Sequence, residues 1–194
     1  MNKGRLEAFS DGVIAIIITI MVLELKVPQG DGFAALKPVV PTLLLYLLSF
    51  VYVGIYWNNH HHMLHACGKV SGAVLWANLH LLFWLSLIPF ATEWMGQNHF
   101  TTAPTAFYGF LLLMCAVAYT ILQSLIIRVE GTRSVLKEAV GRDWKGKTSM
   151  TLYVAAIVFA FWSPLVSHLA YIVVALIWLI PDRRIERKLA KGAD

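Results

Sequence analysis

Three consecutive stretches without a charged residue occupy the middle of the sequence. Residues 38–68, 70–92 and 94–127 contain no Asp, Glu, Lys or Arg, and single charged residues separate them. A helix that crosses the hydrocarbon core of a bilayer needs about 20 mostly apolar residues. These stretches therefore predict transmembrane helices. The composition agrees, because 14% of the residues are charged, whereas soluble domains carry roughly 25%.

The whole chain, residues 1–194, is expected to form one all-α, polytopic membrane domain with six transmembrane helices. The apolar runs and the turn residues between them place these helices near residues 6–26, 39–62, 71–94, 105–128, 149–168 and 169–181. A basic tail at residues 182–194 follows. Six spans with short loops nearly exhaust the chain, which leaves little room for a soluble catalytic domain.

The lysines and arginines are distributed asymmetrically in this six-span arrangement. Fourteen of the sixteen fall on one side of the membrane, and only Lys26 and Lys37 fall on the other. Cytoplasmic loops are enriched in Lys and Arg. We therefore expect a multi-pass protein of the cell (plasma) membrane with both termini in the cytoplasm. The net charge of +5 is interpreted as a topology signal and not as a nucleic-acid-binding surface.

The first predicted helix is unusual because its apolar part is short. Residues 12–23 form an apolar stretch of twelve residues, about 18 Å of helix, whereas the hydrocarbon core is ~30 Å thick. Glu7, Ser10 and Asp11, or Glu24, must then lie near membrane depth. Charged groups there face protein or a water-filled cavity. We therefore expect this helix to be central and shielded from lipid.

The residues of this helix segregate onto distinct faces at 100° per residue. One face carries Arg5, Gly12, Ile16, Thr19 and Leu23, with Ile20 at its edge, whereas Glu7 and Asp11 share another. The apolar stripe fits ordinary helix packing. It also fits a pore lining, in which copies around an axis form rings of Ile16 and Leu23 with a ring of Thr19 hydroxyls between them. Hydrophobic constrictions of this kind gate by dewetting. The pattern leaves both interpretations open.

Three short motifs resemble a known family. The segment Arg5-Leu6-Glu7-Ala8-Phe9-Ser10-Asp11 fits the motif Arg-x-x-x-Phe-Ser-Asp at the start of a first helix. The sequences Tyr-Trp-Asn-Asn-His-His at residues 56–61 and Leu-Ser-Leu-Ile-Pro-Phe at residues 85–90 are also similar. Together they resemble the lysosomal-type potassium channel family, in its bacterial form with a single six-helix repeat.

The resemblance implies a function and an assembly. It implies a potassium-permeable cation channel, not an enzyme, that conducts K⁺ passively through a homotetramer in a bacterial membrane. The first helices would line the pore, with Ile16 at the constriction and Thr19, Ile20 and Leu23 at further pore-facing positions. The expected partners are other copies of the chain, membrane lipid and K⁺. No cofactor is expected.

The motif residues are expected to have a structural role. Ser10 and Asp11 point away from the stripe, and a buried carboxylate without partners is costly. We expect them to bond to polar side chains of the second and third predicted helices. The motif network would comprise Arg5, Phe9, Ser10, Asp11, Trp57, Asn58, His61 and His80.

A cluster of histidines suggests an alternative. His61 and His65 are four residues apart, a spacing at which two imidazoles can share a zinc ion. The sequence shows no matching third ligand with a general-base glutamate, so we predict no metal site beyond an adventitious one. A membrane metalloenzyme and a secondary transporter remain the competing interpretations. Transporters usually show internal repeats and broken helices, and neither is evident in the sequence.

Overall fold

The computed structural model describes residues 2–131, 134–141 and 143–179. Within these ranges the chain is helical and contains no strand. The elements are α1 (Lys3–Leu23), the 3-10 helix η1 (Phe33–Val39), α2 (Val40–His65), α3 (Gly72–Ser86), α4 (Ile88–Gln97), α5 (Thr102–Glu130), α6 (Val135–Val140), α7 (Trp144–Phe159) and α8 (Pro164–Leu179). The prediction of an all-α fold is confirmed.

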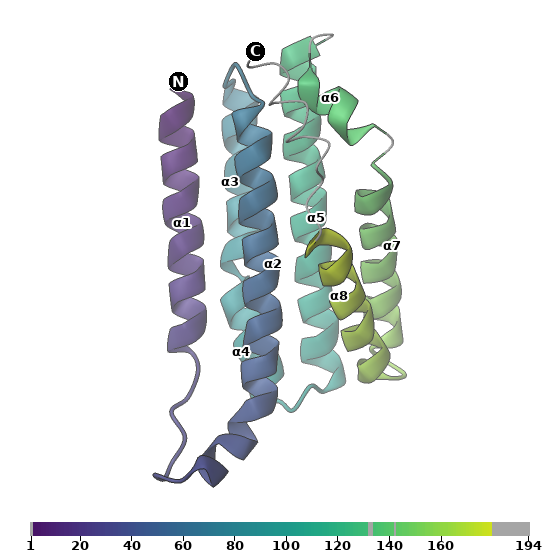
Figure 1. Ribbon diagram of the computed structural model, residues 1–194. Coiled ribbons are helices and arrows are strands. Elements are labelled where there is room, and N and C mark those ends of the chain that lie inside the picture. The colour runs from purple at the N-terminus through teal and green to yellow at the C-terminus, as the bar shows by residue number, and fades with distance from the viewer. Residues whose placement is uncertain (1, 132–133, 142, 180–194) are drawn as a thin grey trace.

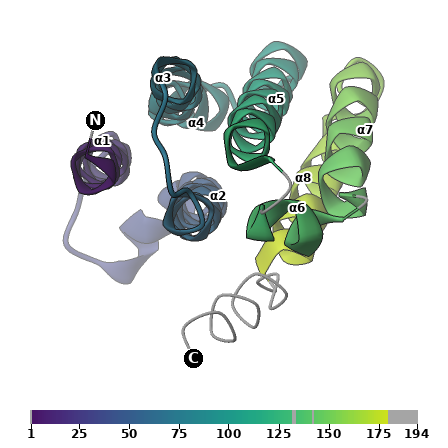
Figure 2. The same ribbon diagram turned by 90° about the horizontal axis from the view of Figure 1, so that it is seen from above.

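The long helices lie side by side, with α1 at one edge of the bundle and α7 at the other (Figures 1 and 2). Four segments are long and apolar enough to cross a membrane: α1, η1 with α2, α3 with α4, and α5. α7 and α8 have 16 residues each, about 24 Å of helix, which is shorter than the ~30 Å of hydrocarbon. The structure therefore supports a membrane protein with four clear spans, and six full-length spans are not established.

The boundary between the last two helices was predicted wrongly. We expected helices at residues 149–168 and 169–181, whereas α7 ends at Phe159 and α8 begins at Pro164. Proline fits the first turn of a helix, where its missing N–H costs nothing, and it disfavours a helical residue before it. This signal outweighs the continuous hydrophobicity of the region. The basic tail at residues 182–194 lies outside the described residues.

The third predicted helix is interrupted. We expected one unbroken helix at residues 71–94, but α3 ends at Ser86 and α4 starts at Ile88. Pro89 has no N–H to donate to the carbonyl of Leu85, which breaks the helical hydrogen-bond pattern. The Leu87 N–H bonds instead to the Trp84 carbonyl at 3.2 Å. Broken membrane helices also occur in transporters, so the expectation that this chain lacks one is not met.

Two hydrophobic cores hold the bundle together. One joins α1, α2, α3 and α5 with Ile88 of α4 and Leu136 of α6, and the other joins α2, α4, α5, α7 and α8. In the second, the Tyr52 hydroxyl donates to the Tyr171 carbonyl at 2.6 Å, and the Tyr171 hydroxyl donates to the Thr105 carbonyl at 3.0 Å. A Cβ at Gly109 would overlap the Tyr171 hydroxyl. These contacts fix α8 against α2 and α5.

Candidate functional site: the first helix and its polar network

One face of α1 is buried against the bundle, and the opposite face is open. Leu6, Ser10, Ile14, Ile17 and Met21 are buried, and they lie on the side packed against α2, α3 and α4. At 100° per residue, these five residues centre almost opposite Gly12 and Thr19. The structure thus separates a packing face from a face that no other part of the described chain covers.

The open face carries the four residues expected to line a pore. Ile16 is 59% exposed, Ile20 41% and Leu23 75%. Thr19 is also exposed, and its hydroxyl donates to the Ala15 carbonyl at 2.9 Å. These exposed fractions show that the described residues of one copy do not pack against the stripe.

The position of α1 differs from the expectation for a single copy. We expected it to be central and shielded, but it lies at the edge of the bundle and packs on one side against α2, α3 and α4 (Figure 2). The reason is that the short apolar stretch is covered on its Ile14 and Ile17 face alone. Any shielding of the open face must come from outside the described residues of this copy.

Ser10 lies at the centre of a buried chain of hydrogen bonds. Its hydroxyl donates to the Leu6 carbonyl at 2.8 Å and accepts from the Asn78 amide at 2.9 Å. The Asn78 oxygen contacts Nε2 of His60 at 2.6 Å. Ser10, Asn78 and His60 are each at most 1% exposed. This chain of bonds ties α1 to α3 and α2 in the first core.

Asp11 takes part in a separate contact at the surface. The Trp57 indole N–H donates to Oδ1 of Asp11 at 3.0 Å. The Trp57 ring in turn stacks on His61, with ring centroids 6.3 Å apart. The structure therefore brings Asp11, Trp57 and His61 together on the side of α2 that faces α1.

The other motif residues lie outside these contacts. Arg5 is exposed and Phe9 is 52% exposed, on the same open face as Ile16. Asn58 is half-buried on α2. His80 accepts a hydrogen bond from the Trp84 indole at 2.8 Å and does not reach the motif.

His60 and Asn78 are the participants that sequence reasoning missed. Asn78 is the only amide between Ser71 and Thr92. A lone amide in an apolar membrane helix needs a hydrogen-bond partner, so its partner could have been sought on the first helix. The choice of His60 over His61 depends on which face of α2 is turned inward, and consecutive histidines conceal that.

Glu7 stands out beside this network. Its Oε1 atom is buried and has no hydrogen-bond partner among the residues that the structure describes. Lys3, one turn earlier, donates from Nζ to the His65 carbonyl at 2.6 Å and thereby caps the end of α2. The buried Glu7 oxygen is a place where a further donor would be favourable, because an unpaired buried acceptor costs about 1–3 kcal/mol.

The opposite end of α1 opens onto an acidic pocket. The carboxyl groups of Glu24 and Glu93 contact each other, and Gln97 donates to Glu93. They line a cavity of about 340 Å³ that His99 and Lys26 also border. Acidic side chains in a cleft raise the local concentration of cations.

The histidines do not form a metal centre in the described part of the chain. His61 and His65 have ring centroids 6.2 Å apart. No group of three or more His, Cys, Asp or Glu side chains in residues 2–131, 134–141 and 143–179 is arranged to hold a metal ion. A three-ligand catalytic zinc site therefore finds no support there.

Comparisons with known proteins identify the family. The family model described as the endosomal/lysosomal potassium channel TMEM175 matches residues 5–89. A potassium channel of Chryseobacterium sp. (strain P1-3) is 60% identical over 192 residues, which are 99% of this chain and 100% of that protein. A potassium channel of Streptomyces collinus is 35% identical over 128 residues, 61% of this chain and 62% of that protein.

A solved structure agrees. The crystal structure of a lysosomal potassium-selective channel TMEM175 homologue from Chamaesiphon minutus has a TM-score of 0.77 and 26% sequence identity to this chain. The match covers 93% of this chain and 97% of that chain. All of these relatives are ion channels and none is an enzyme, so the metalloenzyme alternative falls. Because the Chryseobacterium relative is covered over its whole length, the chain belongs to the TMEM175 family.

Proposed function

We propose that this chain is a subunit of a potassium-permeable cation channel, in which the first helices of four copies surround the pore. The observation that carries the proposal is the open face of α1. Apolar side chains that no described residue of the chain covers, with a hydroxyl between them, are the parts of a hydrophobic constriction. The family description and the names of the bacterial relatives agree with K⁺ as the permeant ion.

In this proposal each residue of the open face has a distinct role. Ile16 forms the narrowest ring, and Ile20 and Leu23 extend the apolar wall towards the acidic end. Thr19 contributes a ring of hydroxyls that replaces part of the hydration shell of a passing cation. Cations gather at the cavity of Glu24 and Glu93 before they enter.

The polar network positions this helix. The Ser10–Asn78–His60 chain and the Asp11–Trp57 bond hold the buried face of α1, so the open face keeps its orientation towards the axis. The buried Oε1 atom of Glu7 has no hydrogen-bond donor among the described residues. In the assembled channel, a water molecule or a neighbouring copy supplies that donor. Arg5 and Phe9 lie at the entrance on the same face as Ile16.

The proposed location is a bacterial cell membrane, with the basic loops and both termini in the cytoplasm. The partners are three further copies of the chain, lipid and K⁺, and the channel needs no cofactor. The relatives are ion channels, which favours a channel over a secondary transporter, and no nucleic-acid partner is proposed.

The test is cation flux in liposomes that contain the purified full-length protein. K⁺ flux that exceeds Na⁺ flux, from protein that native mass spectrometry finds as a tetramer, is the expected result. A stable dimer or monomer that conducts would contradict the four-copy pore. Well-folded tetramers that pass neither ion over a wide range of pH and voltage would contradict the channel itself.

A further inference from the structure

The uncharged part of the helix is much shorter in α7 than in the neighbouring α5. The uncharged part of α5, residues 102–127, has 26 residues, about 39 Å of helix. The uncharged part of α7, residues 148–159, has 12 residues, about 18 Å. α7 also begins well below the upper end of α5, and α6 lies at the corner above it (Figure 1).

Contacts between the two helices fix how deep the charges of α7 lie. Gly109 of α5 lies beside Ile157 of α7, 3.1 Å from a Cβ built on the glycine. The helices run antiparallel, so Lys147 lies level with Tyr119. Tyr119 precedes Arg128, the first charged residue of α5, by nine residues, about 13 Å of helix.

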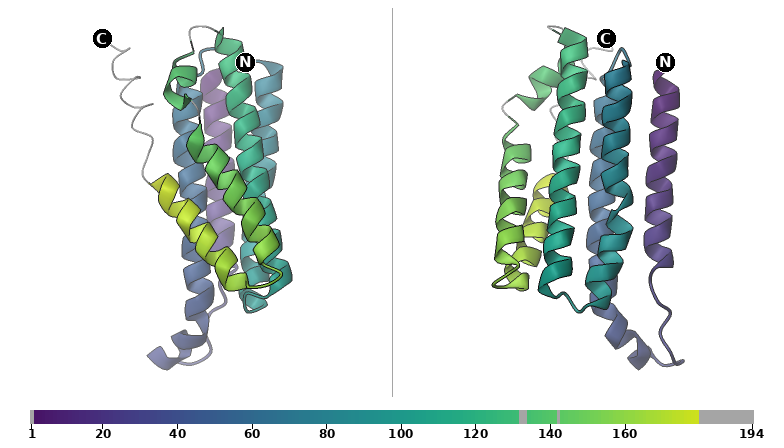
Figure 3. Two further views of the ribbon diagram at one scale, coloured as in Figure 1. Left: turned by 90° about the vertical axis from the view of Figure 1, so that its right-hand side faces the viewer. Right: turned by 180° about the vertical axis from the view of Figure 1, so that it is seen from behind.

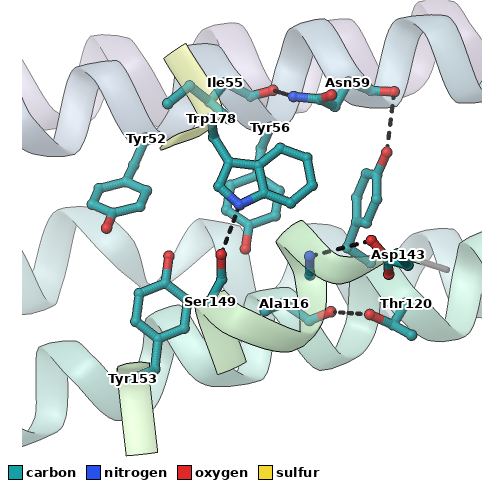
Figure 4. Close-up of a pocket in the computed structure, with 12 residues that line it drawn as sticks. Tyr52, Ile55, Tyr56, Asn59, Ala116, Thr120, Asp143, Ser149, Tyr153 and Trp178 are labelled. Atoms are coloured by element: carbon teal, nitrogen blue, oxygen red, sulfur yellow. Dashed lines mark hydrogen bonds between the residues drawn. The ribbon is translucent and has the colours of Figure 1, made fainter. Parts of the chain in front are cut away.

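A small cavity confirms this register independently. It has a volume of about 40 Å³ and is lined by Asn59 of α2, Thr120 of α5 and Asp143 at the start of α7, among others. In the close-up, Asp143 lies beside Thr120, and the Trp178 indole points at Ser149, to which it donates at 2.8 Å (Figure 4). The first turn of α7 thus lies at the level of Thr120 of α5, ten residues before α5 ends at Glu130.

The side chains in the first turn of α7, which begins deeper than the end of α5, are those of a membrane interface. Trp144 is 56% exposed and Lys147 is exposed, and Lys145 lies over the Trp178 ring at 5.8 Å. Tryptophan concentrates at the level of lipid headgroups. α7 and α8 form an oblique hairpin on the side of the bundle (Figure 3), which leaves this first turn at the periphery.

The charge of this segment, residues 128–147, is positive. Among the residues of this segment that the structure describes, four are basic and three are acidic, a net charge of +1. Of the acidic residues, Glu130 accepts from the Gly68 and Lys69 N–H groups, Asp143 accepts from Gly146, and Glu138 makes its own contacts. A charged residue in hydrocarbon is costly, whereas a short helix is accommodated by local thinning of the bilayer.

We propose that the first turn of α7, together with α6 and the end of α5, binds the phosphate headgroup of an anionic phospholipid at a local thinning of the bilayer. Lys147 lies one turn after Trp144 on the same face of α7, where it neutralises the phosphate while Trp144 anchors the glycerol region. The proposal concerns the outer surface of the chain and does not depend on what the pore conducts.

The first test measures lipid binding. Native mass spectrometry of the full-length protein, titrated with phosphatidylglycerol or phosphatidylcholine, counts bound lipids. Lys147→Gln should weaken phosphatidylglycerol binding about fivefold, and Lys37→Gln, an exposed lysine at the other end of the bundle, should not. Trp144→Ala should weaken binding of both lipids. Unchanged phosphatidylglycerol binding by Lys147→Gln, or an equal loss in Lys37→Gln, would overturn the proposal.

The second test measures depth. Trp144→Cys and Ile121→Cys place thiols at the same depth, on α7 and α5 respectively. Ile121 is 40% exposed and lies at the level of the first turn of α7. In phosphatidylglycerol nanodiscs, a water-soluble methanethiosulfonate should modify the cysteine at position 144 and spare the one at position 121. Equal modification of the two, or protection of both, would overturn the thinning.

Discussion

Asn78 should be one of the most sensitive positions in the first core, although it lies in no motif of the sequence. It joins Ser10 of α1 to His60 of α2 through bonds of 2.9 and 2.6 Å, and it is completely buried. Asn78→Leu keeps a similar volume but removes both bonds. The hydroxyl of Ser10 keeps its bond to the Leu6 carbonyl, whereas the bond between the His60 ring and the Asn78 side chain is lost.

The magnitude follows from these losses. Side-chain hydrogen bonds within membrane proteins average about 0.6 kcal/mol, so two lost bonds cost about 1 kcal/mol. A buried imidazole nitrogen without a partner adds about 1–3 kcal/mol. We therefore expect Asn78→Leu to lower the free energy of unfolding by about 2–4 kcal/mol. Asn58→Leu, a half-buried asparagine of α2, should cost about 0.5 kcal/mol or less.

Reversible unfolding in mixed detergent micelles measures both variants at one fixed protein concentration. A double-mutant cycle separates the network from simple packing. His60→Phe with Asn78→Leu should cost less than the sum of the single changes, because neither partner is then left unpaired. Equal costs for the two asparagines, or strict additivity of Asn78 and His60, would refute the idea that this chain of bonds stabilises α1.

Three further outcomes are expected. Gly109→Ala should destabilise the protein by about 1–3 kcal/mol in the same unfolding assay, because its Cβ overlaps the Tyr171 hydroxyl. Gly54→Ala should not, because nothing lies within 4 Å of its Cβ; equal losses would contradict the close approach. Asp11→Ala removes the acceptor of the Trp57 indole. It should reduce the fraction of tetramer seen by native mass spectrometry while the K⁺/Na⁺ flux ratio changes less. A normal fraction of tetramer would contradict this. Burial raises the pKa of the Cys67 thiol, so its thiolate fraction at pH 8 lies below that of an ordinary cysteine and rises only at higher pH. Iodoacetamide should label Cys67 slowly in the native protein and rapidly after denaturation, and equally fast labelling in both states would be inconsistent with its burial.

The sequence predicted the membrane class and the helical fold because long charge-free stretches leave few alternatives. The 3.6-residue period also separated the face of Ile16 and Thr19 from that of Ile14 and Ile17, but the pattern left open which of the two faces packs within the chain. Two prolines, Pro89 and Pro164, broke helices where hydrophobicity alone predicted continuity. The position of a proline can be read from a sequence. Whether it breaks the helix depends on how the residues after it pack against neighbouring helices.

The candidate network was harder to predict. Asp11 and Trp57 could be paired from the motifs, because both are polar groups expected at membrane depth. The selection of His60 over His61 depends on a rotation of α2 about its axis of only 100°. Such a rotation is set by the packing of three helices at once, which a single sequence does not display.

The most direct test of the pore assignment compares two isoleucine-sized positions of equal exposure. Ile16 of α1 is 59% exposed and Leu44 of α2 is 60% exposed, but only Ile16 lies on the proposed pore face. K⁺ and Na⁺ fluxes are measured in liposomes that contain Ile16→Asn, Leu44→Asn or unmodified protein. We predict that Ile16→Asn raises the flux or narrows the gap between K⁺ and Na⁺, while Leu44→Asn leaves both unchanged. Flux that Ile16→Asn does not alter, or that Leu44→Asn alters equally, would contradict a pore lined by α1.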